Sequence, residues 1–212
     1  MDTQTIDQKV KEIKQSFRQM MDGATAQSMR QKGLDYHLNW GATIPRLREM
    51  AEEIVQSSQF TMSSLAIALW KENVRECKIL ATMLMPADEM LPEVVDIWME
   101  QTPTLEIAEQ AAFNLYQHLP YAADKAFEWL ASPDDLPQIC GYHVLSRLFK
   151  REQEPNERGI NEFLDQSITA LQSSNAALQK AAMQAVLHFA DLSIMHQRLA
   201  QSATRRINLD FV

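Results

Sequence analysis

The sequence predicts an all-α protein made of stacked antiparallel helix pairs. Three observations lead to this fold class. Apolar residues recur at helical spacing through most of the chain, no segment shows the alternation of a strand, and only 5 of the 212 residues are glycine. Because hydrophobic residues make up 46% of the chain and charged residues 23%, we expect a folded chain rather than a disordered one. A single domain over residues 1–212 is the expectation.

The chain begins with three expected helices. The first should end near Asp22 and Gly23, since four apolar residues before them fall on one helical face: Ile6, Val10, Ile13 and Phe17. A second helix is expected over residues 25–38. Pro45 then fits the first turn of a third helix, where its missing N–H costs little.

The remainder of the chain repeats a helix pair in which tryptophan marks the end of the first helix. Trp40, Trp70, Trp98 and Trp129 follow one another at intervals of 30, 28 and 31 residues. The last three end the apolar segments SLAIALW, VVDIW and KAFEW. Second helices are expected at VRECKILATMLM, LEIAEQAAFNLYQHL and QICGYHVLSRLF, and a final pair at INEFLDQSITALQ and NAALQKAAMQAVLHFA. This periodicity favours a HEAT-like helical-repeat superhelix over an ordinary helical bundle, with tryptophans packed between repeats rather than stacked on bases.

Composition narrows the functional classes. The net charge of −8 argues against a protein that is basic overall, although a local basic groove can sit on an acidic body. No apolar run reaches the ~20 residues that span a bilayer and the N-terminus is polar, so we expect no membrane partner and a cytoplasmic location. Cys77 and Cys140 are expected to be buried, reduced thiols. No histidine or cysteine spacing suggests a metal site, and no cofactor is expected.

Basic side chains at helical spacing are candidate phosphate contacts. Two stripes, one after Trp70 and one after Trp129, and several residues nearer the C-terminus make up the set: Lys71, Arg75, Lys78, His143, Arg147, Lys150, Arg151, Lys180, Arg205 and Arg206. If the second helix of each pair lines a concave side, these residues would form a track for duplex DNA. The alternative is an ordinary solvated face whose charge is balanced by neighbouring glutamates.

Two carboxylates are candidate catalytic groups. Glu106 and Glu109 lie three residues apart in an expected helix and can share a face. Such a pair could perform acid–base chemistry or stabilise a cation. The alternative is again a solvated helix surface.

The segment GATIPRLREMAEEI, followed by LAIALWKENVRECKILATMLM, resembles the AlkD-like DNA alkylation repair family. The matching motif residues are Gly41, Pro45, Leu47, Arg48, Leu69, Trp70, Arg75 and Glu76. The resemblance implies a HEAT-like array whose concave groove holds duplex DNA. Active members of the family are glycosylases that remove N3- or N7-alkylated purines, using a carboxylate to stabilise the cationic sugar.

The family's active-site residues carry over only in part. Its catalytic aspartate falls on Glu109, and the adjoining aromatic residue falls on Leu105. Its paired arginines fall on Cys140 and Gly141, and its second tryptophan on Gln184. We therefore expect a DNA- or protein-binding scaffold whose glycosylase chemistry is lost or altered. The alternatives are an active glycosylase that uses Glu109, and a protein–protein scaffold with no nucleic-acid role.

Overall fold

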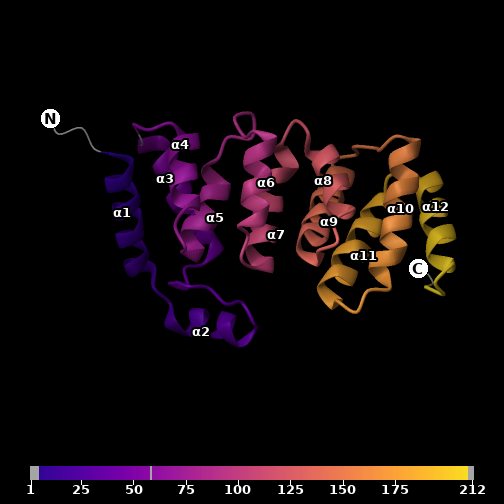
Figure 1. The fold of residues 1–212 in the computed structure, drawn as a ribbon, viewed down its shortest axis with the longest axis horizontal. Helices are drawn as coiled ribbons and strands as arrows, with labels where there is room; N and C mark the ends of the chain where they lie inside the picture. The colour runs from indigo at the N-terminus through magenta and orange to yellow at the C-terminus, as the bar shows by residue number, and fades with distance from the viewer. Residues whose placement is uncertain (1–4, 58, 210–212) are drawn as a thin grey trace. The chain divides into compact units, whose positions relative to one another are not determined.

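The computed structural model describes residues 5–57 and 59–209, and all of their regular structure is helical (Figure 1). These residues form twelve α-helices and two short 3-10 helices, and their one β-type pairing is an isolated bridge between Leu38 and Val74. The predicted all-α fold class is confirmed. The chain divides into two compact units, Met1–Leu115 and Tyr116–Val212, each described by itself below. The single domain over residues 1–212 stays a prediction.

The first unit contains seven α-helices within the described residues. Their bounds are α1 Ile6–Phe17, α2 Gly23–Gln31, α3 Ile44–Ser57, α4 Met62–Trp70, α5 Arg75–Leu84, α6 Pro92–Glu100 and α7 Leu105–Asn114, with a 3-10 turn η1 at Arg18–Met20. Helix α1 packs on α4, and α4 pairs with α5. Helix α5 also packs against both α3 and α7, so these three helices form one layer, the α3–α5–α7 row.

The second unit repeats the same two-layer arrangement. It contains η2 Tyr116–His118, α8 Ala122–Leu130, α9 Asp135–Lys150, α10 Glu157–Leu171, α11 Ala176–Ala190 and α12 Ile194–Arg205. The pairs α8–α9 and α10–α11 are hairpins, and α9 packs on α11 while α8 packs on α10. First helices therefore lie against first helices, and second helices against second helices. We call the second-helix layer the α9–α11 row.

Tryptophan marks the packing between repeats, as predicted. Trp70 at the end of α4 stacks on Trp98 of α6, with ring centroids 4.1 Å apart and planes 2° apart. Trp129 of α8 packs at a tilt on Tyr116, with centroids 5.1 Å apart. All three tryptophans are buried, so they are used in the core and are not available to stack on a base.

Local sequence signals explain most helix boundaries. Thr5 and Gln8 form a capping box at the start of α1, and Asp22 caps α2 by accepting from the backbone N–H of Thr25. Pro92 stands at the first position of α6, where no backbone N–H is required.

Two helices end earlier than predicted, α2 and α7, and one helix was missed; α7 ends at Asn114 and not at Leu119. The second helix ends at Gln31 and not at Leu38, because Gly33 takes a positive φ of 80° and turns the chain out of the helix. Helix α12 was not predicted, since its apolar residues are mostly small or exposed. It is held instead by Ala200, Ala203 and a buried His196.

The thiol prediction is confirmed, since Cys77 and Cys140 are both buried and do not form a disulfide. Burial raises the pKa of the Cys77 thiol to about 12, so it stays protonated at neutral pH. No helix in the described part of the chain is long and apolar enough to cross a bilayer.

Candidate nucleic-acid interface

The segment between α2 and α3 crosses the N-terminus of α5 and is hydrogen-bonded to it. The carbonyl oxygen of Leu38 accepts from the backbone N–H of Arg75 at 3.0 Å, and that of Trp40 accepts from Asp22 at 2.9 Å. Gly41 follows with a φ of 77°, and a Cβ there would lie 2.1 Å from the carbonyl oxygen of Asp22. Only glycine fits this position. Gly41, one of the motif residues shared with the family, is therefore required by the backbone conformation.

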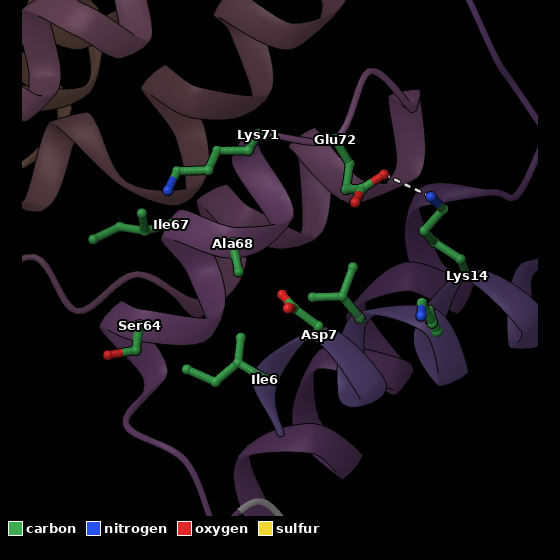
Figure 2. Close-up of a pocket in the computed structure, with 10 residues that line it drawn as sticks. Ile6, Asp7, Lys14, Ser64, Ile67, Ala68, Lys71 and Glu72 are labelled. Carbon is green, nitrogen blue, oxygen red and sulfur yellow. Dashed lines mark hydrogen bonds and ion pairs between the residues drawn. The ribbon is translucent and has the colours of Figure 1, made fainter. Parts of the chain in front are cut away.

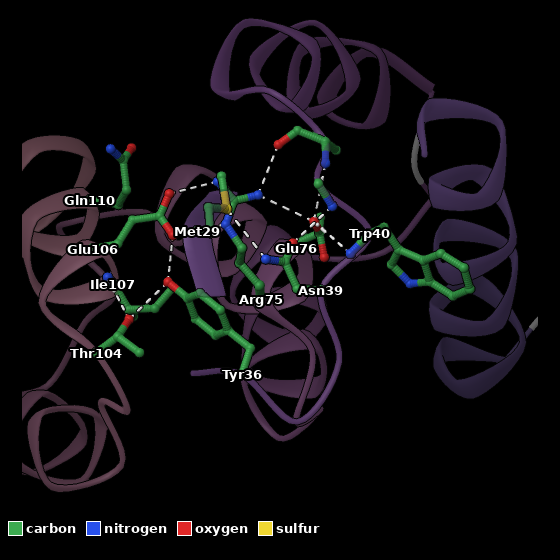
Figure 3. Close-up of polar contacts among 12 residues, drawn as sticks. Met29, Tyr36, Asn39, Trp40, Arg75, Glu76, Thr104, Glu106, Ile107 and Gln110 are labelled. Carbon is green, nitrogen blue, oxygen red and sulfur yellow. Dashed lines mark hydrogen bonds and ion pairs between the residues drawn. The ribbon is translucent and has the colours of Figure 1, made fainter. Parts of the chain in front are cut away.

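Arg75 lies at the centre of a buried polar cluster (Figure 3). Its Nε and Nη2 donate to the two oxygens of Glu106 at 2.8 and 2.6 Å, which is a bidentate ion pair between α5 and α7. Its Nη1 donates to the carbonyl oxygen of Ala42 at 2.8 Å and to Glu76 at 3.2 Å. Arg75 is 1% exposed. Each of its three guanidinium nitrogens therefore has a partner inside the protein.

Tyr36 and Thr104 complete the surroundings of Glu106. The Tyr36 hydroxyl donates to Glu106 and accepts from the Thr104 hydroxyl at 2.8 Å. Burial alone would raise the pKa of Glu106, but the hydrogen bonds and charge of Arg75 outweigh it and hold this pKa below its ordinary value. Glu106 is therefore an ionised ion-pair partner, an arrangement that suits a structural role.

The expected stripe of Lys71, Arg75 and Lys78 does not exist as one exposed face. Lys71 caps the C-terminus of α4, so the chain changes direction before Arg75 begins α5. Lys78 is also buried. Its ammonium donates to the carbonyl oxygen of Trp70 at 3.0 Å and lies 4.3 Å from the centre of the Trp70 ring.

Lys71 instead lines a cavity of about 550 Å³ between α1 and α4 (Figure 2). Lys11 and Lys14 line it too, together with two carboxylates, Asp7 and Glu72. Lys14 pairs with Glu72 at 2.6 Å. Positive and negative side chains are thus nearly balanced in this cavity, which does not favour a phosphate there.

The second unit does place a basic row on one helix. His143, Arg147 and Lys150 follow one another at four and three residues along α9, and Arg147 donates back to the carbonyl oxygen of His143. Lys150 is exposed, and the other two are half-buried. Lys180 is exposed on α11, which packs directly on α9. These four residues are the basic set of the α9–α11 row.

Arg151 contacts η2 and is not part of the basic set. Its guanidinium donates to the backbone and side chain of Gln117 at 3.2 and 2.6 Å, and it lies 3.2 Å from His118 Nδ1. Burial, and then the charge of Arg151, lower the pKa of His118, so the neutral ring can accept this hydrogen bond. Arg205 and Arg206 are exposed at the end of α12, and Arg206 lies 4.0 Å from Asp165.

Packing around Cys140 and Gly141 explains why the family's paired arginines are absent from these two positions of α9. Cys140 is fully buried, and a Cβ at Gly141 would lie 2.5 Å from Leu130 and 2.8 Å from the carbonyl oxygen of Ala126. Helices α8 and α9 are packed too closely there for a larger side chain. Gln184 is exposed on α11, and Glu109 is half-buried on α7.

Sequence reasoning missed Tyr36, which contacts Glu106 and Thr104. Tyr36 was placed inside an expected helix, and Gly33 was the signal that this helix ends earlier. Among the residues that the structure describes, no three His, Cys, Asp or Glu side chains are grouped as a metal ion would require.

Comparison with known proteins gives a family and a fold. The sequence profile of a family described as "DNA alkylation repair enzyme" matches residues 13–188. One similar solved structure is described as "a new family of proteins related to the HEAT-like repeat DNA glycosylases with affinity for branched DNA structures". The structural match covers 96% of this chain and 85% of the chain in that structure, with a TM-score of 0.81 and 16% sequence identity. That likeness confirms the predicted HEAT-like fold. The comparison with curated proteins finds no match.

Proposed function

Because this chain belongs to the DNA alkylation repair enzyme family, we propose that it binds DNA through the α9–α11 row and has lost or altered the family's base-excising chemistry. The observation that carries the proposal is the basic row of α9. His143, Arg147 and Lys150 repeat at helical spacing, and Lys180 on the adjoining helix widens the row. Phosphates along a DNA backbone are bound by cations spread in this way.

The net charges of the two units also favour a DNA-binding surface in the second unit. Residues 116–212 carry nine Lys and Arg against eleven Asp and Glu, so the formal net charge of the second unit is −2. Residues 1–115 carry eleven Lys and Arg against seventeen Asp and Glu, so the formal net charge of the first unit is −6. In the acidic first unit, Arg75 and Lys78 are also buried. The net charge of the second unit therefore repels phosphate less than that of the first.

Loss of the excision chemistry is supported by four positions. Leu105, Gly141 and Gln184 stand where the resemblance expects an aromatic residue, an arginine and a tryptophan. Glu106 is held by Arg75 and Tyr36 and is not available to a sugar cation. A carboxylate without side chains that position the sugar contributes little to catalysis, because positioning supplies much of the barrier reduction.

Excision by Glu109 is the second candidate function. Glu109 is half-buried on α7, at the position onto which the family's catalytic aspartate falls. A half-buried carboxylate is a reasonable stabiliser of a cationic sugar.

Binding to DNA is tested by measuring affinity against salt concentration, with a plain duplex and a branched junction as probes. The junction is included because the similar solved structure is described as having affinity for branched DNA. If the three cations of the basic set, Arg147, Lys150 and Lys180, contact phosphates, the logarithm of affinity should fall with the logarithm of salt with a slope near −3, at about 0.9 per contact. Absence of binding to both probes would contradict the proposal and turn the search to a protein partner.

A further inference from the structure

A histidine of α11 is hydrogen-bonded to the neighbouring helix of the α9–α11 row. Ser146 Oγ, on α9, lies 2.7 Å from Nδ1 of His188 on α11, and Ser146 is 1% exposed. No other hydrogen bond of the His188 ring is found among the described residues, so Nε2 is the nitrogen left for a ligand. The buried serine therefore holds one edge of a half-buried ring and leaves the other edge available.

The same ring lines a cavity of about 310 Å³ at the C-terminal ends of α9 and α11. The charged residues that line this cavity with His188 are Lys150, Glu152 and Asp191, and all three are exposed. While the ring is neutral, one ammonium faces two carboxylates, and their net charge of −1 repels a phosphate close to Lys150. A protonated ring cancels this negative charge.

His188 also lies in line with the one lysine of α11. Lys180, Gln184 and His188 follow one another at four-residue intervals, so they lie on one side of this helix. Lys180 is the only Lys or Arg in the sequence of α11, and it lies about 12 Å along the helix axis from His188. A charged His188 would therefore give α11 a second cation, beside Lys150 of α9.

We propose that His188 is a further phosphate contact of the α9–α11 row, which operates when its ring is protonated, so that DNA binding tightens as the pH falls. Histidine is the side chain that ordinarily gains charge between about pH 8 and about pH 5, and a charged ring can donate from Nε2 to a phosphate oxygen. The Ser146 hydroxyl can donate to a neutral Nδ1 or accept from a protonated one, so it holds the ring in both states. This contact rests on the proposed function, because the row must first bind DNA.

The test measures the affinity of the full-length protein for a labelled duplex by fluorescence anisotropy, at about pH 5.5 and about pH 8 and at about 0.1 M salt. His188→Gln should lower affinity about eightfold at the lower pH and less than about twofold at the higher, because one lost phosphate contact removes the release of about 0.9 counterion. His188→Lys, whose charge is permanent, should bind several-fold more tightly than the wild-type protein at the higher pH.

His37→Gln is the matched control, since His37 is exposed between α2 and α3 of the first unit and should leave both affinities unchanged. The contact is overturned if His188→Gln loses no more affinity at the lower pH than at the higher, or if His37→Gln shows the same loss. Duplex binding that persists in either case leaves the proposed function standing. A wild-type protein that binds the duplex at neither pH overturns both proposals.

Discussion

Replacing Glu106 with alanine is expected to lower the free energy of unfolding by about 3–5 kcal/mol, the cost of removing one partner from a buried ion pair. Arg75 would keep its charge at 1% exposure and lose two of its hydrogen bonds. Tyr36 would lose its acceptor as well. Chemical denaturation followed by circular dichroism measures this change.

Glu100→Ala is the control, since it removes an exposed carboxylate in the last turn of α6 of the same unit. Its loss should stay below about 1 kcal/mol. A loss below about 1 kcal/mol in Glu106→Ala would contradict the structural role given to Glu106.

The same ion pair makes stability depend on pH. The pKa of Glu106 is lowered in the folded state, so its contribution is present above its unfolded pKa and is lost as pH falls through the lower folded value. The wild-type protein should therefore lose stability below about pH 4.5 more steeply than Glu106→Gln, which has no carboxylate to protonate. Parallel acid titrations of the two proteins would contradict this account.

Reversing the charge of Lys150 and Lys180 together is expected to weaken DNA binding roughly 50-fold at about 0.1 M salt, because each lost phosphate contact removes the release of about 0.9 counterion. Both side chains are exposed, so the substitutions should leave the fold intact. The salt slope should also become shallower by about 2. Fluorescence anisotropy of a labelled duplex at several salt concentrations gives both values.

Arg158→Glu is the control for charge itself. Arg158 is exposed on α10, in the same unit but outside the α9–α11 row. It should change affinity only a few-fold and leave the slope unchanged. If the control weakens binding as much per charge as the double variant does, the α9–α11 row is not the DNA contact surface.

The layered fold could be predicted because it depends on periodic features of the sequence. The intervals between tryptophans reflect the repeat length, and Trp70 and Trp98 stack as that regularity suggests. Apolar residues at helical spacing predicted α1 and α3 to within a few residues. Helix α12 was not predicted, because its buried side includes His196 and Thr204 and lacks a run of large apolar residues.

The candidate site was predicted less well, since side-chain partners depend on contacts between distant segments. Glu106 and Arg75 are 31 residues apart in sequence, and nothing in the spacing shows that they pair. Lys71 and Arg75 have helical spacing but lie on different helices. By contrast, His143, Arg147 and Lys150 lie within the single helix α9, so their shared face could be predicted.

The most direct test of the central claim is a base-release assay on duplex DNA that carries N7-methylguanine, with binding measured on the same samples. The account predicts salt-sensitive binding with no release above the spontaneous rate. Release above that rate, abolished by Glu109→Gln without loss of binding, would contradict the claim of lost chemistry and make Glu109 the catalytic carboxylate.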